Sequence, residues 1–113
     1  VIEHLTDPKK ELNILYKMLN KNGILIVGTP NIGSFAAHFF RKNFRLFGPG
    51  HLCLFNPKSL EKILSESGFQ VFNREYPFWE TDYSTVKNIS RMLNPLKISP
   101  PFYGNIMTFY ARK

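Results

Sequence analysis

The fold is decided by two stretches, Val1-Ile2-Glu3-His4-Leu5 and Gly23-Ile24-Leu25-Ile26-Val27-Gly28-Thr29-Pro30-Asn31. The first carries a Glu-His pair, and the second is an apolar run that ends in polar residues. A strand that is apolar on both faces is typical of a parallel sheet covered by helices on each side. Ligands of such sheets bind just beyond the carboxyl ends of the strands. We therefore expect Val1 to lie where a strand has just ended, so that the sequence starts in the middle of an α/β domain.

The composition fits one domain over residues 1–113. Hydrophobic residues make up 43% of the chain and include eleven Phe, which is enough to build an aromatic core. No apolar run approaches the length of a membrane span. The single Cys53 excludes an internal disulfide framework, and it favours a reducing compartment, so we expect a cytoplasmic location.

The charge is strongly basic and unevenly distributed. The formal net charge is +7, and neither residues 12–60 nor residues 83–113 contain an Asp or a Glu. Such a balance suits nucleic acid, an anionic membrane surface or an acidic substrate. It also arises when an acidic part of the same domain lies outside the sequence. We favour this last interpretation and expect no nucleic-acid partner.

Local signals place three helices. Thr6-Asp7-Pro8 is a helix start, and Leu12, Leu15, Tyr16 and Leu19 follow at the spacing of one apolar face that ends before Gly23. Residues 33–42 also favour a helix, although they are crowded with aromatic side chains. Asn56-Pro57 repeats the start signal, and Gly68 ends that third helix.

The remaining segments predict three strands. The first is Ile24 to Val27, broken by residues 28–31 because Pro30 cannot continue a hydrogen-bond ladder. The second starts at Phe69 and extends at most to Trp79, and the third is residues 106–111. A short helix within 83–93 and a proline-rich loop over 94–104 separate the last two. The alternation indicates an α/β fold, with room for an antiparallel pair at one edge.

In order and spacing, these segments resemble the second half of class I S-adenosylmethionine-dependent methyltransferases. The matching segments are Val1–Leu5 with Asp7-Pro8, Leu19–Val27, Thr29–Asn31, Gly50–Phe55 with Pro57 and Leu60, and Ser67–Phe69. The resemblance covers residues 1–75 well, is loose over 76–104 and returns at the final strand.

The resemblance implies a Rossmann-like sheet of which this chain supplies strands five, six and seven with flanking helices, the last strand antiparallel. It implies S-adenosylmethionine as cofactor, and residues 81–104 as a variable insert that sets specificity. The glycine-rich turn and the acidic residue that hold the cofactor in the family are not in this sequence. We therefore expect the isolated chain to be inactive and not to bind the cofactor.

Glu3 and His4 would face the cofactor and the substrate, respectively, at the carboxyl edge of the sheet. Histidine is well suited to accept a proton from a hydroxyl near neutral pH. Methyl transfer depends more on alignment than on proton transfer. His4 is thus a candidate catalytic base, a substrate-positioning residue or a structural group that orders the following helix start.

His51 lies in a Gly-Pro-Gly-His-Leu loop that can fold over a pocket. Some family members, among them small-RNA 2′-O-methyltransferases, bind a metal through a Glu-His set and a distant His, which suggests a possible site at Glu3, His4 and His51. We favour a substrate-contacting or loop-bracing role for His51 and expect no metal.

Other candidate substrate contacts are Thr29 and Asn31 at the end of the first strand, and Trp79 beside the insert. Asn31 has an alternative role as the cap of the next helix. The aromatic-basic segment 35–47 has two functional interpretations, a lid over the substrate or a helix on a membrane surface. We favour a third, in which the aromatic side chains belong to the core and the charges are solvated. Cys53 is predicted to be a buried small residue without a partner.

The favoured function is methyl transfer to a small-molecule acceptor, with an oxygen nucleophile suggested by His4. The alternative is a non-catalytic basic interaction module that retains half of the fold. In either case the strand at 24–27 would expose an unpaired edge, so we expect self-association through it.

Overall fold

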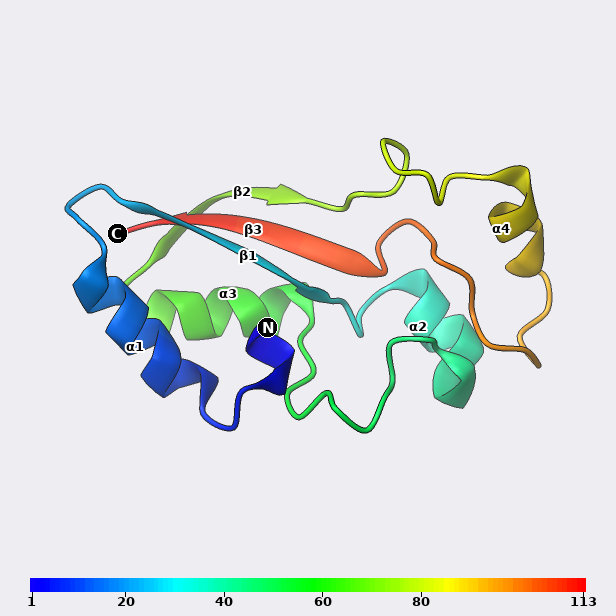
Figure 1. Cartoon of the computed structure of the whole chain (residues 1–113), viewed down its shortest axis with the longest axis horizontal. Helices are drawn as coiled ribbons and strands as arrows, with labels where there is room; N and C mark the ends of the chain where they lie inside the picture. Colours follow the sequence, from blue (N-terminus) through cyan, green and yellow to red (C-terminus); the bar gives the residue numbers. More distant parts are fainter.

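The computed structural model describes all 113 residues and consists of a three-stranded sheet with helices on one face and at one end (Figure 1). The elements in chain order are η1 (Ile2–His4), α1 (Pro8–Met18), β1 (Ile24–Pro30), α2 (Phe35–Phe40), η2 (Arg41–Asn43), α3 (Pro57–Glu66), β2 (Gln70–Glu75), α4 (Val86–Arg91) and β3 (Ile106–Arg112). α1 and α3 lie below the sheet, whereas α2 and α4 lie beyond the end toward which β1 runs. No helix is both long enough and apolar enough to cross a bilayer.

β3 lies between β1 and β2 and is antiparallel to both. β1 pairs with it without interruption from Ile24 opposite Arg112 to Pro30 opposite Ile106. The pairing of β2 contains an irregularity between Val71 and Asn73. The prediction of an α/β fold with an antiparallel last strand is therefore confirmed.

The predicted break of the first strand at residues 28–31 is wrong, because β1 continues through Pro30. Pro30 occupies the last position of an edge strand, where a missing N–H costs little. The second strand ends at Glu75, well before Trp79. α2 is shorter than residues 33–42, because Ser34 caps its start and Arg41 leaves the helical conformation, with φ of 48° and ψ of −118°.

The predicted helix starts are confirmed by their caps. The side chain of Asp7 accepts a hydrogen bond from the N–H of Lys10, and Pro8 follows as the first helical residue. Asn56 and Ser59 form a reciprocal capping box at the start of α3. Each cap satisfies N–H groups that have no partner inside the helix.

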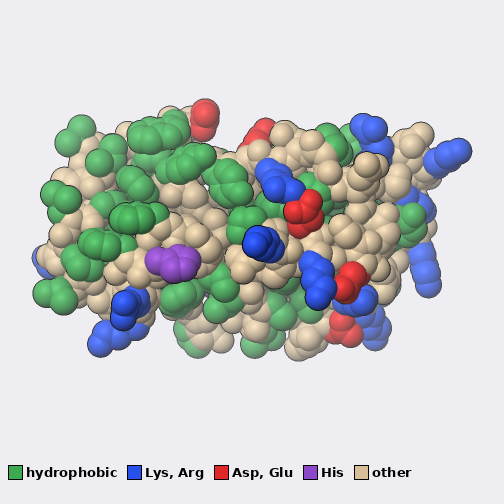
Figure 2. All heavy atoms as spheres, turned by 180° about the vertical axis from the view of Figure 1, so that it is seen from behind, with side chains coloured by type: hydrophobic (Ala, Val, Ile, Leu, Met, Phe, Trp, Pro, Cys, Tyr) green, Lys and Arg blue, Asp and Glu red, His purple; other side chains and the backbone are tan.

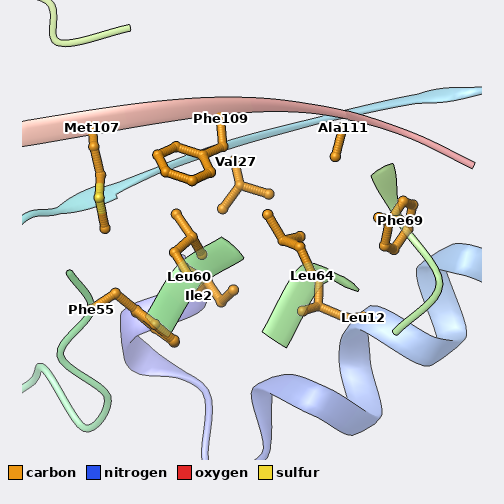
Figure 3. Packing of buried hydrophobic residues seen from close by; sticks show 10 residues of the cluster. All are labelled: Ile2, Leu12, Val27, Phe55, Leu60, Leu64, Phe69, Met107, Phe109 and Ala111. Atoms are coloured by element: carbon orange, nitrogen blue, oxygen red, sulfur yellow. The ribbon is translucent and has the colours of Figure 1, made fainter. Parts of the chain in front are cut away.

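Two hydrophobic clusters form the core. The larger joins the inner face of the sheet to η1, α1 and α3 (Figure 3), and its members are Ile2, Leu12, Val27, Phe55, Leu60, Leu64, Phe69, Met107, Phe109 and Ala111. The smaller joins α2 to the segment after α4 and contains Ala36, Ala37, Phe40, Phe44 and Met92. The second cluster fixes the 81–104 segment against α2.

The outer face of β1 is exposed, contrary to the expectation of a strand covered on both faces. Ile24 and Ile26 retain 50% and 59% of their accessible surface. β1 is also an edge strand, with only β3 beside it. Along that edge, a cavity of about 210 Å³ is lined mainly by aliphatic side chains of η1, α1 and β1, with Glu11 the one charged side chain.

Candidate functional site

Glu3 lies in η1, and its carboxylate points inward against β1. Its Oε2 atom accepts a hydrogen bond from the hydroxyl of Thr29 at 3.2 Å and another from the amino group of Val1 at 2.9 Å. In chain 1–113, burial raises the pKa of Glu3. The hydrogen bond from the Val1 amino group, a hydrogen bond from the backbone of Glu3, the charge of the amino group and the hydrogen bond from Thr29 together hold that pKa below its ordinary value. The carboxylate is therefore ionised at neutral pH.

His4 and His51 come together although 46 residues separate them. Their ring centroids are 4.8 Å apart in an edge-on arrangement. Nδ1 of His4 donates to the carbonyl of Gly50, and Nδ1 of His51 donates to the carbonyl of Leu46, each at a distance of 2.5 Å. A carbonyl only accepts, so Nδ1 carries a hydrogen in both rings, and in the neutral form of each ring the lone pair is on Nε2.

The Nε2 atom of His4 lies 3.6 Å from Oε1 of Glu3. The hydrogen bonds from Val1 and Thr29 both go to the other oxygen, Oε2. A protonated His4 would thus have a carboxylate beside it. The ligand atoms of Glu3, His4 and His51 all lie within 4.8 Å of one another, so these three side chains are the ones in this chain that could hold a divalent cation.

The loop before α3 positions His51, and backbone contacts fix it against η1. The N–H of Cys53 donates to the carbonyl of Glu3 at 3.0 Å, and the N–H of Ile32 donates to the carbonyl of Phe55 at 2.9 Å. Cys53 is half-buried, and its thiol faces the carbonyl of Leu5 at 3.5 Å. Sequence reasoning missed these contacts and gave Cys53 no partner.

Thr29 and Asn31 are buried and already hydrogen-bonded within the chain. The amide of Asn31 donates to the carbonyl of Gly104 at 2.9 Å and accepts from the N–H of Gly33 at 2.8 Å. Asn31 does not cap α2, because the side chain of Ser34 does so. Thr29 therefore contacts Glu3, whereas Asn31 lines a separate cavity, and neither offers a free polar group.

Trp79 lies in a different place from Glu3, His4 and His51. It lines a cavity of about 520 Å³ together with Glu75, Tyr76, Pro77, Glu80 and Tyr103. A neighbouring cavity of about 350 Å³ contains Asn31 and shares Tyr76 and Tyr103 with the first. Neither tyrosine stood out in the sequence, since their meeting depends on the path of the insert.

The aromatic-basic segment 35–47 divides between core and surface. Phe40 and Phe44 are buried, which agrees with the core interpretation. Phe35, Phe39 and Phe47 keep 40% or more of their surface exposed, so the segment is not core alone. His38 is exposed, and its Nδ1 is bonded to the carbonyl of Ser34 within its own helix.

Comparisons with solved structures find the same fold. A methyltransferase from Thermotoga maritima, described as S-adenosylmethionine-dependent and a possible histamine N-methyltransferase, superposes with a TM-score of 0.68 at 22% identity, over 99% of this chain and 52% of that one. A methyltransferase from Archaeoglobus fulgidus, also described as S-adenosylmethionine-dependent, gives 0.62 at 19% identity, over 99% of this chain and 55% of that one. The chain thus spans about half the length of these structures.

No curated protein matches the sequence. A family model described as a methyltransferase domain matches residues 1–73, which contain the Glu3–His4 pair, His51 and the elements from η1 to most of β2. That match covers more than half of the chain, and the superpositions agree with it in fold. The chain therefore belongs to the methyltransferase domain family.

Proposed function

We propose that the intact domain containing this chain transfers a methyl group from S-adenosylmethionine to an oxygen nucleophile of a small-molecule acceptor. The observation that carries the proposal is the Nε2 atom of His4, which has a free lone pair and lies 3.6 Å from the Oε1 atom of Glu3. That arrangement suits a group that receives a proton during the reaction.

His4 acts on the acceptor. As the acceptor oxygen attacks, its O–H bond breaks and the proton moves to Nε2 of His4. The resulting imidazolium is stabilised by the carboxylate of Glu3 at its side. The hydrogen bond from Nδ1 of His4 to Gly50 keeps the ring oriented for this transfer.

S-adenosylmethionine supplies the electrophilic methyl group when bound. Of the residues in this chain, Glu3 can contact S-adenosylmethionine, through its Oε1 atom. The aliphatic cavity along β1 provides no polar cradle for a nucleoside. We propose that the remaining contacts come from a preceding part of the domain, that β1, β2 and β3 are strands five, six and seven of its sheet, and that residues 81–104 are its variable insert.

On the acceptor side, we propose that His51 closes over the substrate next to His4. Thr29 and Asn31 shape the wall, and Trp79 contributes an aromatic surface through the cavities that meet at Tyr76 and Tyr103. We place the enzyme in the cytoplasm, in keeping with its one unpaired cysteine.

The test uses the intact domain with His4→Ala, and His38→Ala as the matched control. His4→Ala should lower turnover about 100-fold or more, because general base catalysis contributes that much, and it should leave the affinity for S-adenosylmethionine unchanged. An equal loss of turnover and cofactor affinity would make His4 structural.

The second candidate is a non-catalytic basic interaction module, which the net charge of +7 favours. It differs from the first in its expected behaviour with cofactor. An intact domain that binds no S-adenosylmethionine in calorimetry would support it. Chain 1–113 alone should bind none under either proposal.

We also propose that chain 1–113 self-associates through the free edge of β1. Sedimentation should detect a dimer or larger species, and Ile26→Lys should weaken it, because a charged side chain on an edge strand opposes pairing. A monomer at all concentrations would exclude the proposal.

A further inference from the structure

The loop that follows α4 displays three strongly exposed aliphatic side chains. Leu93, Leu96 and Ile98 follow α4 and retain 84%, 87% and 65% of their accessible surface. Figure 2 shows hydrophobic side chains gathered over the end that carries α2 and α4, to the left in that view, whereas charges of both signs mix over the opposite end. Isolated exposed leucines are ordinary, but three within six residues form a patch.

The exposure is built into the backbone. The N–H of Ser99 donates to the carbonyl of Asn43 at 2.9 Å, and the side chain of Asn43 donates to the carbonyl of Pro95 at 3.0 Å. Ser99 is 1% exposed and Met92 is 8% exposed, so both ends of the segment are anchored. The three aliphatic side chains between these anchors are therefore held outward.

Two cations lie among these side chains. Arg91 and Lys97 line a cavity of about 460 Å³ with Asn43, Asn94, Leu96 and Ile98. Both are exposed, and neither forms an ion pair. No carboxylate side chain occurs anywhere in residues 83–113 or 12–60, so none from these segments neutralises them. We name Arg91, Leu93, Leu96, Lys97 and Ile98 the basic–aliphatic patch.

We propose that the basic–aliphatic patch docks the protein on an anionic phospholipid surface. The cavity between Arg91 and Lys97 accepts a lipid phosphate, and Leu93, Leu96 and Ile98 enter the boundary between headgroups and acyl chains. Buried aliphatic area together with attraction to anionic lipid is the combination that holds peripheral proteins on membranes. A nucleic acid would fit less well, since single strands stack on aromatic side chains and the apolar members of this patch are all aliphatic.

The test is co-sedimentation of chain 1–113 with phosphatidylcholine vesicles that contain about one third phosphatidylglycerol, compared with phosphatidylcholine alone. We expect binding to the anionic vesicles only, weakened by added salt. Arg91→Ala with Lys97→Ala should lower the partition coefficient about 25-fold, because each cation near the surface is worth about fivefold. Leu93→Ser with Leu96→Ser should lower it about tenfold or more.

The opposite end supplies matched controls. Lys10 and Lys17 are exposed and line a polar cavity of about 430 Å³, and Ile14 and Met18 are exposed aliphatic residues on the same helix. Lys10→Ala with Lys17→Ala, and Ile14→Ser with Met18→Ser, should leave vesicle binding unchanged. Circular dichroism should give the same spectrum for all four double variants.

Four results would overturn the proposal. The first is that the chain does not bind anionic vesicles, and the second is that patch and control variants lose vesicle binding equally. The third is that inorganic phosphate competes fully with the vesicles. The fourth is that a single-stranded oligonucleotide displaces the vesicles and still binds the leucine variants. The third would indicate a site for free anions, and the fourth a nucleic-acid surface. If the first result is found and the leucine variants also lose self-association, the patch binds a second copy of the chain.

Discussion

The hydroxyl of Thr29 donates a hydrogen bond to the carboxylate of Glu3 across 3.2 Å, and this contact ties η1 to the inner face of β1. Thr29 is 2% exposed and Glu3 is 9% exposed, so water cannot readily replace either partner. The same carboxylate lies beside His4. The position of His4, the proposed proton acceptor, therefore depends on β1 through Glu3, although His4 forms no hydrogen bond with β1.

Thr29→Val should destabilise the chain by about 1–2 kcal/mol, because it keeps the shape but leaves a buried carboxylate with one partner fewer. Urea unfolding at neutral pH measures the change. Thr108→Val, on the outer face of β3, is the control and should stay within about 0.5 kcal/mol of the parent. Equal effects of the two substitutions would mean that the hydrogen bond contributes nothing.

The stabilisation from Glu3 should depend on pH. Its pKa in the folded chain is lowered from the ordinary 4.5, so the ionised form is favoured by folding. The contribution is complete above pH 4.5 and is lost as the pH falls through the folded-state pKa. The free energy of unfolding of the parent should therefore exceed that of Glu3→Gln most at neutral pH, with the gap closing in acid. A gap that widens in acid would contradict the assignment.

Asn31→Ala should destabilise the chain by about 1–3 kcal/mol, because the buried carbonyl of Gly104 loses its donor. It should also loosen the start of β3 relative to the end of β1, which hydrogen exchange at residues 104–108 would detect. Asn13→Ala on the exposed side of α1 is the control. Unchanged exchange in the Asn31 variant would show that the backbone pairing alone holds these ends together.

Gly68→Ala and Gly48→Ala form a matched pair. Gly68 has φ of 94°, and an added Cβ would lie 2.8 Å from the ring of Tyr16, whereas a Cβ at Gly48 meets nothing within 4 Å. We expect Gly68→Ala to lower stability by about 1–3 kcal/mol and Gly48→Ala to leave it nearly unchanged. Thermal unfolding distinguishes the two. Similar melting temperatures would mean that Tyr16 moves aside at little cost.

Removal of metal should not affect methyl transfer by the intact domain. The proposed proton transfer uses the Nε2 lone pair of His4, and a cation bound by Glu3, His4 and His51 would occupy that lone pair. Turnover should thus be the same with and without EDTA. A loss in EDTA that Mn²⁺ or Zn²⁺ restores would reassign Glu3, His4 and His51 to a metal centre.

Sequence alone predicted the features that depend on neighbouring residues. The helix starts at Pro8 and Pro57 follow from capping residues close by in the sequence. The end of α3 follows from Gly68, which has φ of 94°. The end of β1 could not be predicted in the same way. Whether Pro30 is tolerated depends on its place at the sheet edge opposite Ile106, which lies 76 residues further along the chain.

The candidate site likewise contains a part that was predictable from adjacent residues and a part that depends on the fold. The Glu3–His4 pair stands out because the two residues are adjacent. Its partner His51 is brought there by a loop held through backbone contacts of Cys53, Ile32 and Phe55, and no residue pattern encodes those contacts. Tyr76 and Tyr103 likewise meet only after the 81–104 segment folds back.

The central position of β3 has a consequence for synthesis. β1 and β2 do not touch each other in the sheet, and each finds its only partner in the last seven residues before Lys113. Until the ribosome has made β3, both strands remain without that partner, because β3 follows them in the sequence. Domains usually fold in the order in which they emerge. Here closure of the sheet must wait until β3 has emerged, so nascent chains depend on protection of their exposed strands until then.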